Sequence, residues 1–406
     1  SVLVQELKEI DRIATPRIIF TNKATEEKNL GRLLGYIIGD GYINKNRIEF
    51  VNADKEILED FIGLTKELFN ISPEYNKVTN NITRLIYWNK KFVNFIIALI
   101  KNKDEKYTSQ YKCIPKRFLT GGLETTSNLL ASLYDTDGTV DKNKQVIEFC
   151  SKNEKLVDQI QRLLLRFNIM ARKKERICCA SNTKNKIKRK DFYLYITGYE
   201  NIKKFYINIP LKCKHKKERL ENHLKCNKKT NPNLELLPIE TNTLIKKAIN
   251  LLGISYKPLR KKYPKLAAYI ENRCNPTRQG LQEIIPILSS KLLQIYSSGL
   301  SLKKDQLQLV KTMDQLGLSG MQTGREIGVS QQIIRRDWAI NRFQAKSENL
   351  KNFFNFIQSA ISLRLIELKS ILNTLYNLAN SDIFWDEIVS IEKVKGEKFV
   401  YDLTIP

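Results

Sequence analysis

The sequence contains one short pattern twice, about a hundred residues apart. Residues 33–41 read LLGYIIGDG and residues 130–138 read LASLYDTDG. Each copy is an apolar run that contains small residues, which allow two helix backbones to approach closely, and each ends in an Asp-Gly step that stops a helix. Two such helices packed side by side would bring Asp40 and Asp137 together at their C-terminal ends.

The segments that flank the two copies also match, in the order hairpin, amphipathic helix, hairpin and Lys-Lys-Phe helix. The corresponding ranges are 41–50 and 138–149, 69–71 and 167–169, 84–88 and 192–196, and 90–92 and 203–205. The sequence therefore predicts a unit of helix, hairpin, helix, hairpin, helix that is duplicated. A period of this length is too long for a solenoid and favours two units related by a pseudo-twofold axis.

These matched copies resemble the single-chain LAGLIDADG (dodecapeptide) homing endonucleases, of the type encoded in inteins. The resemblance implies an α+β fold in which each repeat is αββαββα and the two motif helices form the central interface. Two four-stranded sheets would form a saddle over the DNA major groove. By position, Asp40 and Asp137 would be the acidic residues that bind the divalent metal, Mg²⁺. The alternative is a duplicated α/β core in which these aspartates only end helices.

The charge of the chain favours a polyanionic partner. Sixty-nine Lys and Arg residues against 43 Asp and Glu give a formal net charge of +26, which makes double-stranded DNA the first candidate. A lysine-rich solvated surface is the alternative. No apolar run reaches the roughly 18 residues of a membrane span, and the N-terminus lacks a signal-peptide pattern. We therefore expect an intracellular monomer with access to genomic DNA and no membrane partner.

The seven cysteines do not indicate a disulfide framework, because their number is odd and no Cys-x-x-Cys pair occurs. The only two histidines, His215 and His223, lie between Cys213 and Cys226. These four residues could form a zinc site, but their spacing fits no standard finger. A basic helix is the alternative interpretation.

A polar linker at 101–112 ends in Lys112-Cys113-Ile114-Pro115, which resembles the Lys-x-Ile-Pro element that precedes the second motif of intein endonucleases. The family has a lysine there whose ammonium group reaches the active site, so the resemblance implies this catalytic role for Lys112. A symmetric lysine is expected after the second repeat, and Lys216 or Lys217 is the candidate. The alternative for Lys112 is a solvated linker lysine.

Basic residues on the hairpins would supply phosphate contacts and some base readout if the hairpins face DNA. The candidates are Lys45, Arg47, Lys142, Lys144, Arg172, Lys173 and Lys174. A second basic run, at 184–190, is equally well explained as a solvated loop.

Residues 239–380 are mainly helical by periodicity, and residues 323–336 resemble a helix-turn-helix. In this interpretation Gly324 lies where the helices approach, Gly328 makes the turn, Val329 is buried and Ser330 caps the recognition helix. The candidate groove-reading residues are Gln331, Gln332, Arg335 and Arg336. A plain helical hairpin is the alternative.

Both ends of the chain resemble parts of an intein splicing domain. Residues 1–25 resemble the end of the N-terminal splicing segment, and residues 381–406 resemble the start of the C-terminal one, which also contains a Tyr-Asp-Leu-Thr run. The sequence as given has no histidine before His215 and no final His-Asn pair, so we do not expect it to splice. The expected domains are 1–25, 26–228 (repeats 26–111 and 112–228), 239–380 and 381–406.

Together these features predict a site-specific homing endonuclease that makes double-strand breaks in DNA by metal-dependent phosphodiester hydrolysis. One alternative is a DNA-binding regulator that keeps the fold and the helix-turn-helix but has lost catalysis. Another is an RNA maturase. The presence of both carboxylates favours the enzyme, because a regulator would have little reason to retain them together.

Overall fold

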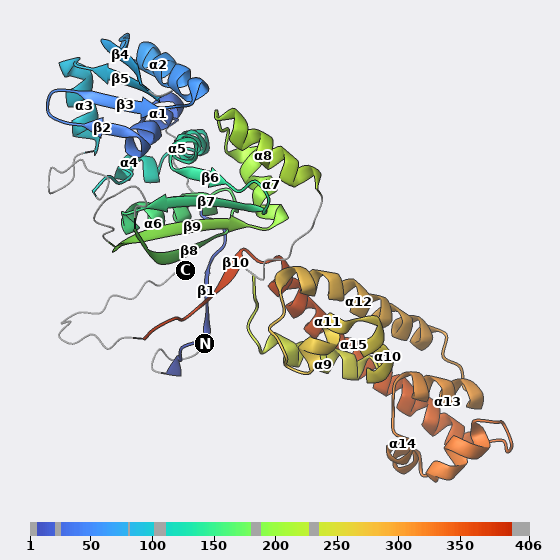
Figure 1. Cartoon of the computed structure of the whole chain (residues 1–406). Coiled ribbons are helices and arrows are strands. Elements are labelled where there is room, and N and C mark those ends of the chain that lie inside the picture. Colours follow the sequence, from blue (N-terminus) through green and yellow to red (C-terminus); the bar gives the residue numbers. More distant parts are fainter. Residues whose placement is uncertain are drawn as a thin grey trace. The chain divides into compact units, whose positions relative to one another are not determined.

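The computed structural model describes residues 6–20, 26–79, 82–100, 111–179, 188–226 and 235–391. The chain forms two compact units, one of residues 16–232 and one of residues 1–15 with 233–406 (Figure 1). Within the described ranges, no helix combines the length and the apolar character that crossing a membrane requires. The expected linker at 101–110, the basic residues 184–187 and the strand expected near 399–406 lie outside the described residues.

The unit of residues 16–232 contains two copies of the expected αββαββα repeat, which confirms the predicted order of elements. The first repeat consists of α1 (Lys28–Gly39), β2 (Gly41–Ile43), β3 (Ile48–Asn52), α2 (Lys55–Phe69), β4 (Tyr75–Thr79), β5 (Ile82–Tyr87) and α3 (Lys90–Ile100). The second consists of α5 (Leu123–Thr136), β6 (Gly138–Val140), β7 (Val146–Ser151), α6 (Glu154–Leu165), β8 (Ala171–Cys179), β9 (Lys188–Thr197) and α7 (Tyr199–Asn208). A short helix α4 (Lys116–Leu119) precedes the second repeat, and α8 (Lys214–Lys225) follows it.

Each repeat forms a four-stranded antiparallel sheet with the same connectivity. The strand orders are β2-β3-β5-β4 and β6-β7-β9-β8. The registers match as well, because Gly41 pairs with Phe50 in the first sheet and Gly138 with Phe149 in the second. Both phenylalanines are fully buried, so the helix-facing side of each sheet carries the apolar residues.

The repeated Phe-Asn-Ile triplets mark the chain reversals that follow α2 and α6. Asn70 and Asn168 have φ of 54° and 56°, in the left-handed region that asparagine tolerates better than most residues. At the other end of these helices, the side chains of Asp54 and Asn153 accept hydrogen bonds from backbone amides of the first turn. The helices therefore begin and end at positions that the local sequence specifies.

The motif helices α1 and α5 pack against each other as the small residues predict. A Cβ atom on Gly35 would lie 2.0 Å from Ser132 Oγ and 2.6 Å from the Leu129 carbonyl oxygen, and one on Gly39 would lie 2.1 Å from Thr136 Oγ1. These separations are far below van der Waals contact. Glycine is therefore required at both positions for the two backbones to lie this close.

We expect Gly35→Ala to destabilise the unit by about 1–3 kcal/mol, because the added methyl group would overpack the α1–α5 interface. The matched control is Gly63→Ala in α2, where a Cβ atom would meet nothing within 4 Å. That substitution should stabilise the protein by about 0.5–1 kcal/mol, since alanine favours helix more than glycine does. Urea denaturation of both variants measures the difference, and equal free energies of unfolding would contradict the close approach.

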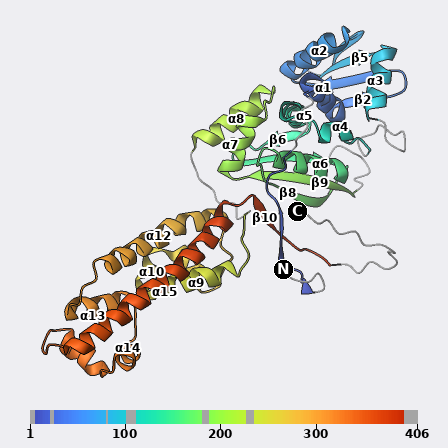
Figure 2. The same ribbon diagram turned by 180° about the vertical axis from the view of Figure 1, so that it is seen from behind.

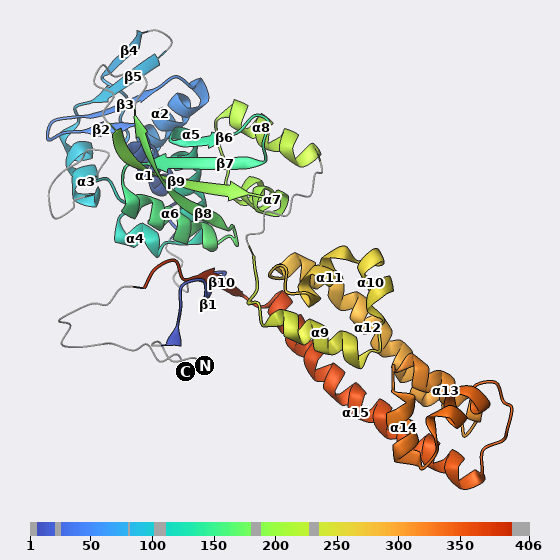
Figure 3. The same ribbon diagram turned by 60° about the horizontal axis from the view of Figure 1, so that its bottom comes forward.

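The second unit is a helical body with a two-stranded sheet. Its elements are β1 (Arg12–Pro16), α9 (Thr241–Leu251), α10 (Tyr256–Lys262), α11 (Pro264–Ile270), α12 (Arg278–Leu300), α13 (Gln306–Gln315), α14 (Gly320–Ile327), the π-helix η2 (Ile333–Trp338), α15 (Ser347–Asn380) and β10 (Ile383–Glu387). The helices share one apolar core. The long helix α15 runs along this body beside α12 (Figures 2 and 3).

Strands β1 and β10 pair with each other, although they lie at opposite ends of the chain. The Ile10 amide donates to the Ile388 carbonyl at 2.9 Å, and the Ile388 amide donates to the Asp11 carbonyl at 2.9 Å. Arg12 adds an ion pair with Glu387 at 2.6 Å. The chain therefore enters and leaves the long segment between these two strands at adjacent points.

Candidate active site and nucleic-acid interface

Asp40 and Asp137 cap the C-terminal ends of the paired helices α1 and α5. The Asp40 amide donates to the Tyr36 carbonyl and the Asp137 amide to the Leu133 carbonyl, both at 3.0 Å. Burial raises the pKa of Asp40. The pKa of Asp137 is raised to about 6, mainly by desolvation and secondly by the negative charge of Asp40. Part of the Asp137 residue is nevertheless exposed to solvent. The two carboxyl groups are therefore close enough to repel each other.

Asn52, at the end of β3, holds the Asp40 carboxylate in place. Its side-chain amide donates to Asp40 Oδ2 at 2.7 Å, and its Oδ1 accepts from the Asp54 amide at 2.8 Å. In the second repeat Ser151 takes the equivalent place and accepts from the Asn153 amide at 3.1 Å. Asn52 was not among the residues predicted from the sequence, although the matched positions of Asn52 and Ser151 were an available signal.

Lys112 is a buried residue that lies against the C-terminal end of α1. Its ammonium group donates to the carbonyl oxygens of Ile37 at 2.9 Å and Ile38 at 3.2 Å, and also to that of Gly41. Burial lowers the pKa of Lys112 to about 8, while the charges of Asp137 and Asp40 oppose this change. Lys112 is therefore not a solvated linker lysine.

Lys216, in α8, makes the equivalent contacts at the end of α5. Its ammonium group donates to the carbonyl oxygens of Tyr134 at 2.9 Å and Asp135 at 2.6 Å, which correspond to Ile37 and Ile38 in the first repeat. Lys216 is buried and its pKa is lowered, chiefly by desolvation. Lys217 is exposed, so of the two candidates it is Lys216 that mirrors Lys112.

The loop that carries Lys112 is fixed by two residues that the sequence analysis did not identify. Asn153 donates from its side-chain amide to the Lys112 carbonyl at 2.7 Å. The Gln159 side chain forms two hydrogen bonds with the Ile114 backbone. Its Oε1 accepts from the Ile114 amide at 2.8 Å, and its Nε2 donates to the Ile114 carbonyl at 3.0 Å. Both residues belong to the second repeat, which therefore holds the lysine that faces the first motif helix.

This donor set suits a hard divalent cation such as Mg²⁺. Carboxylate and carbonyl oxygens are the ligands that such ions prefer, and the C-terminal ends of two helices carry partial negative charge. The raised pKa values of Asp40 and Asp137 mean that their ionised forms are disfavoured without a counter-ion. A cation between Asp40 and Asp137 would relieve that repulsion.

The open face of the second sheet carries several of the expected basic residues. Arg172 pairs with Tyr195 and Lys174 with Tyr193 across β8 and β9. Arg176 was not among the residues predicted from the sequence. Its Cζ atom lies 5.0 Å from the centroid of the Tyr193 ring and 5.2 Å from that of the Tyr195 ring. An arginine over aromatic rings, beside exposed basic side chains, forms a surface that can contact phosphates and bases.

Lys173 is separated from Arg172 and Lys174, contrary to the expected common surface. It pairs with the buried Leu194 and so points to the helix-covered side of the sheet. There its ammonium group forms ion pairs with Glu154 at 2.7 Å and Asp158 at 2.6 Å. The alternation of side chains along a strand is the physical reason.

The hairpin turns carry the other expected basic residues. Lys45, Lys142 and Lys144 are exposed. Arg47 is paired with Glu49 at 2.6 Å in the first sheet, and Arg84 lies 3.7 Å from the same carboxylate. Arg47 is therefore held by a carboxylate, whereas the three lysines are available at the surface.

In the helical unit, α14 and η2 are joined by the turn that the sequence predicts. Gly328 has φ of 72°, and a Cβ atom on Gly324 would lie 2.3 Å from the Val329 carbonyl oxygen. Ser330 Oγ accepts from the Ile333 amide at 3.4 Å. Val329 is only half-buried, and the second helix is largely a π-helix of six residues.

Arg335 is exposed but also makes contacts within the protein, and its expected role in reading a groove stays a prediction. Its guanidinium group pairs with Asp314 and donates to the Leu318 carbonyl at 3.2 Å. It thereby joins η2 to α13 and to the segment before α14. The other three candidates, Gln331, Gln332 and Arg336, are also exposed, and Arg336 pairs with Asp337 at 3.1 Å.

The four residues considered for zinc do not come together. His223 is buried, and its Nε2 donates to the Asp141 carbonyl oxygen at 2.6 Å. Cys226 is exposed at the C-terminal end of α8, whereas Cys213 and His215 lie at the beginning of that helix. The helix rises about 1.5 Å per residue. Cys213 and His215 at its beginning are therefore too far from His223 and Cys226 near its end to share one ion.

Comparison with known proteins gives a family match for the two repeats. Residues 27–107 and 124–210 match the model of the LAGLIDADG-like domain. These two stretches contain α1 and α5 with the sheets that follow them. Over these two stretches the duplicated unit is thus similar to the LAGLIDADG-like domain, as its repeated motif predicts.

Curated relatives match nearly the whole chain at low identity. The replication factor C small subunit of Methanocaldococcus jannaschii is 26% identical over 99% of this chain, and that of Thermococcus kodakarensis is 26% identical over 100%. The ATP-dependent DNA helicase Hel308 of M. jannaschii is 27% identical over 99%. The matches cover 24%, 50% and 34% of these proteins, so the chain spans half or less of the length of each.

Two solved proteins share a weak structural similarity with the chain. A variant of the homing endonuclease I-DmoI has a TM-score of 0.33 and 17% identity, covering 45% of this chain and 94% of that one. Full-length DUF199/WhiA from Thermatoga maritima has a TM-score of 0.35 and 14% identity, covering 83% and 94%.

Proposed function

We propose that this chain is a site-specific homing endonuclease that cuts both strands of duplex DNA with the help of a divalent metal ion. The observation that carries the proposal is the symmetric pair of half-sites. Each half-site has a carboxylate at the end of a motif helix, Asp40 or Asp137, and a buried lysine on the last carbonyls of that helix, Lys112 or Lys216. Two half-sites suit two phosphodiester bonds, one in each strand.

The residues of the chain have distinct parts in this proposal. Asp40 and Asp137 would hold Mg²⁺, which when bound supplies positive charge to the scissile phosphates. Lys112 and Lys216 keep two positive charges beside the carboxylates, where negative charge develops during phosphodiester hydrolysis. Asn52 orients the Asp40 carboxylate through its 2.7 Å hydrogen bond. The close packing of α1 and α5 sets the separation of the two half-sites.

DNA contacts are assigned to the open faces and turns of the two sheets. Lys45, Lys142, Lys144, Arg172 and Lys174 remain candidates, and Arg176 with its two tyrosines is added. Lys173 is removed because Glu154 and Asp158 hold it on the helix-covered side of the sheet. Arg47 and Arg335 each pair with one carboxylate but have side chains that are 40% and 41% exposed, so both stay candidates. The formal net charge of +26 supports binding that depends strongly on salt.

An origin as an inserted element, such as an intein, is also proposed. The paired strands β1 and β10 place entry and exit of the intervening chain side by side. Segments similar to nearly the whole chain occur within proteins whose names are unrelated, including a replication factor subunit, a helicase and a translation initiation factor. A segment that is shared by proteins of unrelated names is expected of an insertion that moves between hosts.

The alternatives are a DNA-binding regulator and an RNA maturase. One observation favours the enzyme over the regulator: Asp40 and Asp137 both end the paired motif helices, where the charge of Asp40 adds to burial in raising the pKa of Asp137. A protein that only binds DNA would be more stable with a neutral residue there.

Incubating the chain with a randomised duplex library in Mg²⁺, and sequencing the cut ends, tests the function. The enzyme should enrich one long target and cut both strands. Retention of duplex DNA without any cutting would instead identify a regulator. Preferential binding of structured RNA in a competition experiment would identify a maturase.

The helical unit is proposed to extend the contacts beyond those of the repeats, with η2 as the recognition helix. Gln332→Ala combined with Arg336→Ala should shorten the protected footprint on one side and flatten the salt dependence of binding, because phosphate contacts are lost. Lys351→Ala, an exposed lysine at the start of α15, is the control. A footprint of unchanged length in the double variant would make the helical unit purely structural.

A further inference from the structure

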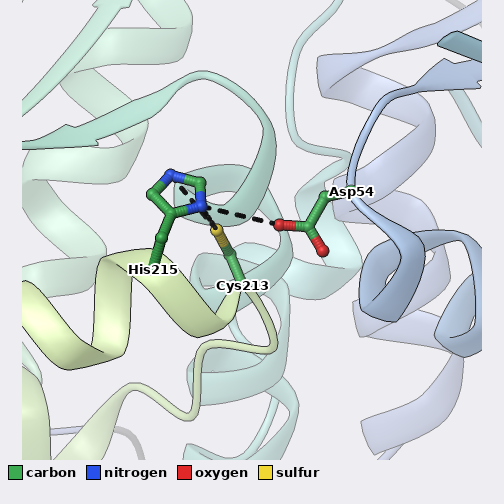
Figure 4. Close-up of side chains that lie close together, drawn as sticks. All are labelled: Asp54, Cys213 and His215. Atoms are coloured by element: carbon green, nitrogen blue, oxygen red, sulfur yellow. Dashed lines mark hydrogen bonds and ion pairs between the residues drawn. The ribbon is translucent and has the colours of Figure 1, made fainter. Parts of the chain in front are cut away.

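Three side chains of different chemistry meet in the unit of residues 16–232, and neither Asp40 nor Asp137 is among them (Figure 4). Cys213 and His215 come from the start of α8, and Asp54 comes from the residue that precedes α2. One ligand atom from each lies within 4.8 Å of the others. Cys213 Sγ is 3.0 Å from His215 Nδ1, and His215 Nδ1 is 3.7 Å from Asp54 Oδ2.

These separations are close to those between ligands of one tetrahedral ion. With Zn–S near 2.3 Å and Zn–N or Zn–O near 2.0 Å, two ligand atoms on zinc lie about 3.3–3.6 Å apart. The distances of 3.0 and 3.7 Å lie just below and just above that range. Asp54 can supply an oxygen without losing its structural part, because Oδ1 caps α2 through the Ile57 amide while Oδ2 faces His215.

The donor types distinguish this cluster from the carboxylate pair. A thiolate and an imidazole favour Zn²⁺ over Mg²⁺ or Ca²⁺. A thiolate and a carboxylate together supply two negative charges, which balance those of a divalent ion. Both ligands lie at helix N-termini, whose partial positive charge stabilises their anionic forms. Cys213 is fully buried, whereas the His215 side chain is 57% exposed, so a fourth position is left on the solvent side for water.

The backbone that carries the ligands is fixed by hydrogen bonds. The Cys213 amide donates to Asp135 Oδ1 at 3.0 Å, and the Lys212 amide donates to both oxygens of Asp135. The Asp54 amide is bonded to Asn52 Oδ1. Such outer contacts orient metal ligands and reduce the cost of assembling them.

We propose that Asp54, Cys213 and His215 form a Zn²⁺ site with one open position, separate from the proposed catalytic metal site. The ion would tie the start of α2 in the first repeat to the start of α8 in the second. Lys216 lies one helical turn beyond Cys213. Zinc would therefore hold the segment that delivers Lys216 to the end of α5.

The test measures zinc bound by the full chain after dialysis, and then replaces zinc with cobalt. Wild-type protein should retain one zinc ion per chain, and its cobalt form should show a thiolate-to-cobalt charge-transfer band. His215→Ala should weaken zinc binding by at least about tenfold, and Cys213→Ser should remove the charge-transfer band. Cys226→Ser, an exposed cysteine on the same helix, is the matched control and should change neither.

Two further measurements keep the result interpretable. His215 is exposed, so His215→Ala should keep its helical circular dichroism even if the buried Cys213→Ser variant unfolds. The double variant Asp40→Asn, Asp137→Asn should still bind zinc, since neither residue belongs to the cluster. The proposal is overturned if the wild-type chain binds no zinc, if His215→Ala binds it as tightly as wild type, or if the charge-transfer band survives in folded Cys213→Ser.

Discussion

Asp40→Asn and Asp137→Asn will each lower the rate of double-strand cleavage by at least about a thousandfold while leaving DNA affinity within about tenfold. Each carboxylate is assigned to the metal ion and not to a base edge, so its loss acts on the reaction rather than on recognition. Single-turnover cleavage of a target plasmid at saturating enzyme measures the rate, and a filter-binding titration measures the affinity. Full cleavage by either variant in Mg²⁺ would refute the assignment.

The same variants should be at least as stable as wild type at pH 7 in EDTA, which separates loss of activity from unfolding. The folded-state pKa of Asp137, about 6, lies above the value of about 3.9 for an unfolded chain. Neutral Asp137 therefore adds to the free energy of unfolding below about pH 4. This contribution is lost as the pH rises through about 6 and Asp137 ionises. The asparagine side chain of Asp137→Asn would remain neutral and avoid that loss. A marked drop in the melting temperature of this variant would contradict the expectation.

Lys112→Met and Lys216→Met will each slow cleavage by about a hundredfold or more and will weaken DNA binding much less. A positive charge near the scissile phosphate stabilises charge that develops in the transition state. Methionine preserves much of the apolar stem of a buried lysine, so packing is disturbed less than by alanine. Lys217→Met is the matched control, since Lys217 is exposed and should leave the single-turnover rate unchanged.

The pH profile provides a second measurement of the same assignment. Lys112 has a pKa of about 8, so its ammonium charge is present below pH 8 and is lost above it. The wild-type cleavage rate should therefore fall above about pH 8. Lys112→Met should be slow at every pH and should lack the part of this decline that comes from Lys112. An identical decline in that variant would assign the titration to another group.

Much of the candidate site could be predicted from the sequence, because it depends on local features that occur twice. The small residues of the motif helices, such as Gly35 and Gly39, specify a close helix pair wherever they lie in the chain. The Asp-Gly steps end both helices at equivalent positions, which brings Asp40 and Asp137 together. Lys112 was identified by the short element around it.

The remaining assignments required the tertiary structure, since they depend on which face of an element is covered. Lys216 rather than Lys217 contacts α5 because the inward face of α8 carries Cys213, Lys216, Leu220 and His223, at helical spacing. Lys173 and Arg335 are held by carboxylates that lie elsewhere in the sequence.

The sequence by itself determined the repeat, the ends of the motif helices and the identity of the paired carboxylates, because each follows from residues close together in the chain. Only the tertiary structure decided the proposed zinc ligands. His223 lies more than two turns along α8 from Cys213 and bonds instead to the Asp141 carbonyl. Asp54, about 160 residues earlier in the chain, takes the third place, because packing of the two repeats sets the start of α2 beside the start of α8.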